Sequence, residues 1–265
     1  MLVAFLCNHH SNCFLFAMLA SGHLPIPWDL PLIISQRLLE AFGTYVSGHF
    51  LERIPSHETL LIVSNHRSFL DAPVLMSGLG RTVNFACHPY MGQVPLMRNV
   101  IQGLGGFPLE TSGKGSRSLL QQADALLRCQ RWVGIFPEGG EPMVKSTQPE
   151  QIGEFQRGFA HLALRSQIPN LTILPVAIAS HSETEAQTIP LQVLSWFDPS
   201  EPLFRQSGQH PAVFYKNVDL LVGNPIKITA QQQERYQGKS AKATAIELTQ
   251  RCHAEIADLL KQSLG

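Results

Sequence analysis

Apolar and polar residues follow two periods along this chain, and together these periods predict an α/β domain. Residues 60–63 form an apolar run that ends in Ser64-Asn65-His66, which predicts a buried strand with polar residues at its carboxyl end. Other apolar runs predict strands at 82–87, 106–109, 132–136 and 171–179 and, less regularly, at 191–197, 212–215 and 218–228. Helical spacing predicts helices at 116–128, from Phe155 onward and at 240–262. Because strands alternate with helices, we expect a mostly parallel or mixed central sheet flanked by helices.

The first 50 residues differ from the rest. No charged residue precedes Asp29, but a polar stretch at 8–12 interrupts the apolar residues, whereas a bilayer span needs about 18 continuous ones. From Leu30 to Phe42 apolar residues recur at helical spacing, with a polar side that includes Ser35. Such a helix lies either in a membrane interface or against the main domain. We expect an N-terminal amphipathic helical segment in residues 1–50, a candidate membrane attachment, followed by one domain over 51–265.

Composition narrows the classes of function. The 20 basic and 20 acidic residues balance, and the pI is near 7.2, so nucleic acid is not an expected partner. The five cysteines are scattered and odd in number, which favours free thiols in a reducing compartment. Cys7 and Cys13 bracket two histidines, but the spacing matches no familiar metal site, and we expect no metal.

The first candidate site follows the strand at 60–63 and reads Asn65-His66-Arg67-Ser68-Phe69-Leu70-Asp71. Ligands bind at such strand ends in open α/β sheets. If His66 precedes the helix and Ser68 caps it, Asp71 lies in the first turn and can reach the imidazole. A carboxylate on one ring nitrogen makes the other nitrogen a better base, and the absence of a nucleophile suggests that the substrate supplies a hydroxyl. The alternative is that Asp71 only caps the helix.

A second candidate site, Phe136-Pro137-Glu138-Gly139-Gly140, also follows an apolar strand. A carboxylate before two glycines makes a turn in which backbone amides can approach a ligand. The alternative is a turn without a role in binding.

Together the two segments resemble the glycerolipid acyltransferase family, whose best-known members are 1-acylglycerol-3-phosphate acyltransferases. The resemblance runs from about Thr59 to Ala179 in five blocks in the expected order. Besides the two segments above, the blocks are Gly105-Gly106-Phe107-Pro108-Leu109, Phe155-Gln156-Arg157-Gly158-Phe159 and Leu174-Pro175-Val176-Ala177-Ile178.

The resemblance implies transfer of a fatty acyl group from acyl-CoA or acyl-carrier protein to a glycerolipid hydroxyl, with no other cofactor. The leading acceptor is 1-acylglycerol-3-phosphate, which gives phosphatidate in phospholipid biosynthesis. His66 would be the general base and Asp71 would orient it. The substrate-binding residues that the resemblance implies are Asn65, Ser68, Glu138, Gly139 and Pro175. A membrane-associated enzyme, peripheral or monotopic and facing the cytoplasm, is expected.

Three positions depart from the family pattern. Glu110-Thr111, Gly140-Glu141 and His88 stand where the family commonly has cationic residues. A phosphate monoester needs Arg, Lys or a helix N-terminus, and Lys114, Arg117 and Arg157 are the candidates to replace them. The alternative is that these three side chains are ordinary charged residues in solvent. A non-phosphate acceptor, such as diacylglycerol, another lysolipid or a lipid alcohol, therefore stays an alternative.

Overall fold

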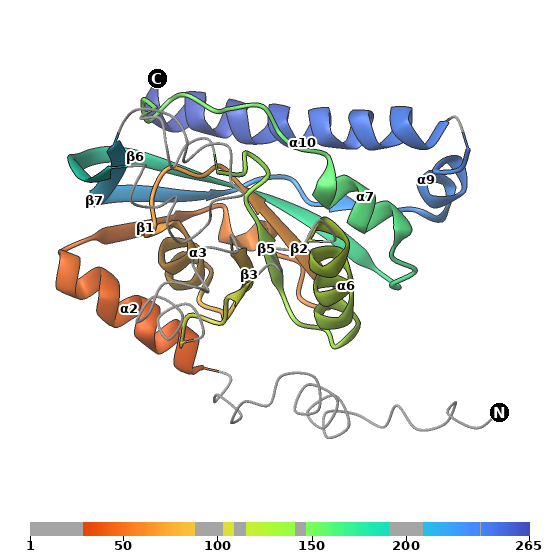
Figure 1. Ribbon diagram of the computed structural model, residues 1–265, viewed down its shortest axis with the longest axis horizontal. Coiled ribbons are helices and arrows are strands. Elements are labelled where there is room, and N and C mark those ends of the chain that lie inside the picture. The colour runs from red at the N-terminus through yellow and green to blue at the C-terminus, as the bar shows by residue number, and fades with distance from the viewer. Residues whose placement is uncertain (1–28, 88–102, 109–114, 141–146, 191–208, 239) are drawn as a thin grey trace.

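The computed structural model describes residues 29–87, 103–108, 115–140, 147–190, 209–238 and 240–265 (Figure 1). The α-helices within these ranges are α2 (Leu30–Phe42), α3 (Asp71–Leu79), α6 (Gly115–Arg128), α7 (Gly158–Arg165), α9 (Ala230–Arg235) and α10 (Ser240–Leu264). The strands are β1 (Tyr45–His49), β2 (Thr59–Ser64), β3 (Asn84–Cys87), β4 (Phe107–Pro108), β5 (Val133–Ile135), β6 (Leu171–Pro190), β7 (Gln209–Val222) and β8 (Ile226–Lys227). A single 3-10 turn, η1 (Leu51–Arg53), joins β1 to β2 along the chain.

The described strands form one mixed sheet in the order β1-β7-β6-β2-β5-β3-β4, with β8 paired to β6. Strand β2 lies in the middle and runs parallel to both β5 and β6. Strands β6 and β7 are antiparallel, whereas β1 runs parallel to β7. This confirms the expected mixed sheet with flanking helices.

Helices cover both faces of the sheet because the central strand alternates its apolar side chains between them. Leu61 and Val63 of β2 pack in a core with residues of α6, α7 and α10. Leu60 and Ile62 face the opposite core, which holds most of the apolar side chains of α3 together with Leu39 of α2. Figure 1 shows α10 and α2 on opposite sides of the sheet. A strand buried on both faces is continuously apolar, as the sequence of β2 is.

Two boundaries differ from the sequence-based expectation. The run at 212–215 and the first part of the run at 218–228 form one strand, because the backbone of β7 passes through the exposed Lys216 and Asn217 without ending. The second run is divided, since β7 ends at Val222 and β8 begins at Ile226. The helix expected from Phe155 begins at Gly158, and the N–H of Gln156 before it donates to the carbonyl of Pro137 at 2.8 Å. The strand expected at 191–197 lies outside the described residues.

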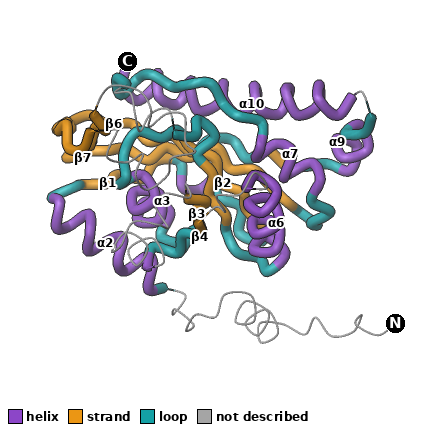
Figure 2. The backbone as a smooth tube through the Cα atoms, in the orientation of Figure 1, coloured by secondary structure: helices purple, strands orange, loops and turns teal. Residues whose placement is uncertain are grey.

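Strands β6 and β7 extend well beyond the expected strand at 171–179. They pair with each other as far as Pro190 and Gln209, forming the two-stranded arm visible in Figure 2. Strand β2 pairs with β6 only up to Val176, so the arm reaches past the carboxyl end of the central strand. The residues that follow β2 therefore lie beside the extended parts of β6 and β7.

The expected amphipathic helix is present as α2, and it contacts α3. Ser35, expected on its polar side, is buried: its hydroxyl donates to the Pro31 carbonyl at 2.7 Å and lies 3.7 Å from the Met76 sulfur. Ile33 on another side of the helix is half exposed. The division at residue 50 stays a prediction, although β1 on its N-terminal side already belongs to the sheet. Of the helices described, none is long and apolar enough to cross a membrane.

The cysteines differ from the expectation of free thiols at one position. Cys252 is free and buried on α10, where burial raises the pKa of its thiol. Cys129, just after α6, is disulfide-bonded. Spacing along the chain did not indicate this because folding brings distant cysteines together.

Candidate active site

His66 and Asp71 lie in direct contact at the carboxyl end of β2. The imidazole Nδ1 is 2.7 Å from the Asp71 Oδ2 atom. The Asp71 side chain is almost wholly buried, whereas 17% of the His66 side chain is exposed. With the carboxylate as acceptor, Nδ1 donates its hydrogen and Nε2 is left with a free lone pair. The geometry is that of a general base held by a carboxylate.

The loop between β2 and α3 folds around the Asp71 carboxylate. Asp71 Oδ2 accepts the backbone N–H groups of Arg67 and Ser68 at 2.7 and 2.8 Å, as well as the His66 ring. Helix α3 begins at Asp71 and has no side-chain cap. Ser68 lies three residues before this helix, yet it makes contacts of the expected kind: its hydroxyl accepts the N–H of Leu70 at 3.0 Å, and its own N–H donates to Asp71. The hydroxyl also donates to the Val213 carbonyl of β7 at 2.6 Å.

Asn65 fixes the start of the same loop. Its side-chain Nδ2 donates to the Ile178 carbonyl at 2.9 Å, and its Oδ1 accepts the Ile178 N–H at 2.8 Å. This replaces the ladder pairing that ends where β2 leaves β6 at Ser64. Asn65 and Ser68 are thus committed to backbone groups, and their expected contact with substrate stays a prediction.

Two aromatic rings hold the imidazole plane. The Phe136 ring stacks on His66 with centroids 4.3 Å apart, and Phe85 stacks on Phe136 at 5.2 Å. Gly134 makes this possible, because a Cβ there would lie 2.1 Å from the Phe85 ring. The stacked phenyl rings thus restrain the face of the imidazole, and Asp71 restrains its edge at Nδ1.

Glu138 joins the second predicted segment to the first. Its Oε1 accepts the His66 backbone N–H at 2.9 Å, and its Oε2 accepts the Gly153 N–H at 2.6 Å. A Cβ on Gly153 would lie 2.8 Å from Oε2, so this approach requires glycine. Gly139 has a φ of +71°, which suits the turn after Glu138. The sequence predicted this site, but the structure gives Glu138 a partner in the loop of His66 rather than an open carboxylate.

Pro175 lies in β6 beside Val63 of β2, close to the end of the central strand. Its side chain is buried, and its carbonyl accepts the N–H of Gly223 at 2.8 Å. Pro175 is therefore part of the central sheet near the strand end that leads to His66 and Asp71. Its expected role in shaping a substrate pocket stays a prediction.

Of the three candidate phosphate-binding residues, the structure describes the side chain of Arg157 only. Lys114 lies outside the described residues, and Arg117 lies in the first turn of α6 without a described side chain. Arg157 is exposed just before α7 and lines a pocket of about 690 Å³ between residues 154–157 and α10.

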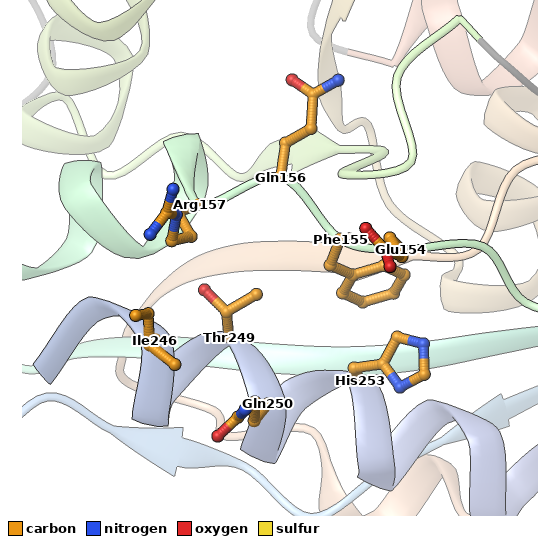
Figure 3. A pocket seen from close by; sticks show the side chains of 8 residues that line it. All are labelled: Glu154, Phe155, Gln156, Arg157, Ile246, Thr249, Gln250 and His253. Carbon is orange, nitrogen blue, oxygen red and sulfur yellow. The ribbon is translucent and has the colours of Figure 1, made fainter. Parts of the chain in front are cut away.

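Figure 3 shows this pocket, with Phe155 and His253 next to each other in its lining and Gln156 pointing away from α10. The two rings meet edge to face, with centroids 4.9 Å apart. The His253 Nε2 atom lies 3.1 Å from the Gly153 carbonyl, and the N–H of Gly153 reaches Glu138. The pocket is thus joined to the loop of His66 through one residue, Gly153, and the Glu138 carboxylate.

The sequence did not indicate two side chains that also hold the loop, Glu183 of β6 and Tyr215 of β7. Arg67 is buried and makes two hydrogen bonds to the Glu183 carboxylate, at 2.8 and 2.9 Å, and it also donates to the Thr147 carbonyl. Burial lowers the pKa of Arg67, but the hydrogen bonds to Glu183 and the nearby acidic groups Tyr215, Glu183 and Asp71 together raise that pKa above its usual value. The Tyr215 hydroxyl donates to Asp71 Oδ1 at 2.7 Å. No local motif marks a residue whose partner lies more than 100 positions away.

Glu138 gives the site a testable dependence on pH. Burial raises the pKa of its carboxyl above the usual 4.5, although the N–H groups of Gly153 and His66 oppose the shift. Its contribution to the free energy of unfolding is therefore greatest below pH 4.5 and declines as pH rises through the higher folded pKa. Glu138→Gln stays neutral, so its free energy of unfolding relative to wild type should rise with pH across this window. Denaturant unfolding at several pH values measures this difference, and the exposed Glu234→Gln is the control. A difference that is independent of pH would contradict the assignment.

Comparison with known proteins agrees with this geometry. A sequence model of the acyltransferase family matches residues 46–179, half of the chain, including His66, Asp71 and Glu138. A solved structure, the 1-acyl-sn-glycerophosphate (LPA) acyltransferase PlsC from Thermotoga maritima, is similar with a TM-score of 0.57 and 16% sequence identity, covering 94% of this chain and 88% of that chain. That similarity shows a shared fold. No curated protein matched the sequence. The matched half carries both loops of the site, and the chain belongs to the acyltransferase family.

Proposed function

We propose that this acyltransferase moves a fatty acyl group from a thioester, acyl-CoA or acyl-carrier protein, to a hydroxyl of a glycerolipid. The observation that carries the proposal is the 2.7 Å contact between His66 and Asp71. Of these two side chains, the imidazole is partly exposed and the carboxylate is buried. Among the described residues, no serine or cysteine is hydrogen-bonded to the imidazole. A base without its own nucleophile suits a reaction in which the substrate supplies the hydroxyl.

In the proposed reaction, His66 Nε2 takes the proton of the acceptor hydroxyl as its oxygen attacks the thioester carbonyl. Asp71 keeps the hydrogen on Nδ1 and stabilises the imidazolium that forms. When the tetrahedral intermediate collapses, the C–S bond breaks and the thiolate leaves with the electron pair. Free thiols have a pKa of about 8.5, so the thiolate leaves readily and can take the proton back from His66. The products are an ester and a free thiol.

The acceptor that we favour is 1-acylglycerol-3-phosphate, giving phosphatidate. The support is the family resemblance, in which Arg157 matches a basic position, and the presence of Lys114 and Arg117 shortly after the block Gly105-Gly106-Phe107-Pro108-Leu109. PlsC from Thermotoga maritima, which shares the fold, is named as an acyltransferase for the same class of lipid. The alternative acceptor without a phosphate monoester rests on the neutral or acidic residues at 110–111 and 140–141.

We also propose that the protein works at a membrane surface. Phe69 lies in the loop between β2 and α3, which we call the catalytic loop, and it is partly exposed. Its ring packs edge-on against Phe42 of α2 and Phe214 of β7. Ile33 of α2 and Leu51 are also exposed. An exposed aromatic ring in the catalytic loop, together with exposed apolar side chains on α2 and η1, suits contact with a bilayer that holds both acyl chains. A peripheral or monotopic attachment that faces the cytoplasm stays a prediction.

The reaction is tested with purified protein, a labelled long-chain acyl thioester and a panel of acceptors. The panel holds 1-acylglycerol-3-phosphate, other lysophospholipids, diacylglycerol and long-chain alcohols, and products are identified by mass. His66→Ala should lower acceptor-dependent release of thiol by roughly 100-fold or more, because the general base is lost. Most of the activity surviving in His66→Ala would reject His66 as the base. Thiol release without any acceptor dependence would instead indicate a hydrolase.

Phosphate recognition is tested by neutral substitutions of the three cations. If they bind the phosphate, Lys114→Gln, Arg117→Gln or Arg157→Gln should raise the KM for 1-acylglycerol-3-phosphate about tenfold and leave diacylglycerol unaffected, because one charge-assisted contact is lost. Arg128→Gln is the matched control, since Arg128 lies on α6 and pairs with Asp124 on the same helix. Unchanged KM values in all three variants would remove these residues from acceptor binding.

Membrane attachment is tested without deleting α2, whose buried face belongs to the core. The double variant Ile33→Glu/Leu51→Glu should weaken liposome cosedimentation about tenfold or more, because two apolar side chains no longer enter the interface. Ala243→Glu adds a charge on α10, which covers the opposite face of the sheet from α2, and should have no effect. Equal binding by the double variant and wild type would place the attachment surface elsewhere.

A further inference from the structure

The Asp71 carboxylate has two oxygens with different partners. Oδ2 accepts the His66 ring and two backbone N–H groups, as described above. Oδ1 accepts the hydroxyl of Tyr215 at 2.7 Å. Both side chains are almost completely buried, at 0% and 1% exposure, so water does not compete for this contact. Tyr215 therefore holds the side of the carboxylate that faces away from the histidine.

The arm of β6 and β7 brings Tyr215 to this place together with Glu183. The two residues are direct partners across the antiparallel pair, and each contacts a different residue of the catalytic loop. Glu183 binds the Arg67 guanidinium and Tyr215 binds Asp71. The register of the pair shifts twice just before Glu183, between Ser180 and Ser182 and between Ser182 and Glu183. Such irregularities turn side chains in strands, and they are common next to active sites.

Neither Glu183 nor Tyr215 lies within residues 46–179, the region that matches the acyltransferase family. The matched region ends at the point where β6 leaves the central sheet to form the arm with β7. The arm is therefore a part of this chain that supports the site from outside the matched motifs.

Tyr215 remains a hydrogen-bond donor over any working pH. Burial, together with the charge of Asp71, raises the pKa of its hydroxyl well above 10. The phenol is thus a neutral donor to a buried carboxylate, which is a stronger contact than one between two neutral groups. It also limits rotation of the carboxylate, whose other oxygen must point at His66.

We propose that Tyr215 is a positioning residue that sets the proton affinity of His66 through Asp71. The kinetic part of this proposal rests on the proposed acyl transfer, whereas the histidine titration does not. Donation from the phenol stabilises negative charge on Asp71 and so weakens the attraction of the carboxylate for the imidazolium. Without the phenol, Asp71 binds the imidazolium more strongly, and His66 takes up a proton at a higher pH.

Other charged groups near the dyad are balanced by partners that the substitution leaves in place. Arg67 and Glu183 form an ion pair with each other. Glu138 accepts the backbone N–H of His66 and that of Gly153. Removing one hydroxyl at Tyr215 therefore changes the field at Asp71 without breaking either of these contacts.

The test is Tyr215→Phe in the full-length protein, with Tyr236→Phe as the matched control. Tyr236 loses the same atom but bonds to His161 and Arg165 instead of the catalytic loop. The Cε1–H signal of His66, assigned by its loss in His66→Gln, is titrated by NMR without substrate. Its midpoint should rise by roughly half a pH unit in Tyr215→Phe and stay unchanged in Tyr236→Phe. An unchanged or lower midpoint in Tyr215→Phe would overturn the proposal.

If Tyr215→Phe does not fold, fluorotyrosine at position 215 provides the second test. Fluorine makes the phenol a stronger donor without removing it, so the midpoint of His66 should fall. A midpoint equal to that of wild type or higher would overturn the proposal.

The kinetic experiment uses the same variants. If the protein transfers acyl groups, the acidic limb of kcat/KM should shift to higher pH in Tyr215→Phe, in parallel with the titration, and a limb that does not follow the titration would contradict a role of Tyr215 in catalysis. If the protein shows no acyl transfer, the titration alone still decides whether Tyr215 acts on His66. Failure of the proposed function and failure of this inference are therefore distinguishable.

Discussion

The rest of the site depends on the buried carboxylate of Asp71. A buried charge is costly unless hydrogen bonds compensate it. Here the loop after β2 bends so that two of its own N–H groups, the His66 ring and the Tyr215 hydroxyl all point at one side chain. The hydrogen bonds that fold the loop therefore also orient the imidazole of His66. A loop that failed to satisfy Asp71 would also fail to aim His66.

The sheet places this loop between three supports. The Asn65 amide ties its start to β6, Arg67 ties its middle to Glu183, and Glu138 ties His66 to the turn after β5. These contacts come from strands on both sides of β2, the central strand. The stacked rings of Phe136 and Phe85 complete the enclosure from the β5 and β3 side. An enclosed base with one exposed edge suits a reaction in which water competes with a lipid hydroxyl.

The sequence predicted the elements whose apolar residues follow a clear pattern. It did not indicate contacts between residues that lie far apart along the chain. Strand β2, helix α10 and the His66–Asp71 pair were predictable because apolar runs and a short spacing mark them. Tyr215 was not, because its partner lies 144 positions away and only the register of β7 brings it there. The boundary of α3 was not fully predictable either: a cap at Ser68 implies an earlier start, whereas the helix begins at Asp71, and the Ser68 hydroxyl also donates to a distant acceptor, the Val213 carbonyl.

The central claim is that Asp71 keeps the hydrogen of the neutral imidazole on Nδ1 and leaves Nε2 free to take a proton. Long-range ¹⁵N–¹H correlation spectra of the ring of His66 at neutral pH test it most directly, because they distinguish a protonated ring nitrogen from an unprotonated one. The account predicts a protonated Nδ1 and an unprotonated Nε2 in wild type, and loss of that preference in Asp71→Asn. A hydrogen on Nε2 in the wild-type protein would contradict the account.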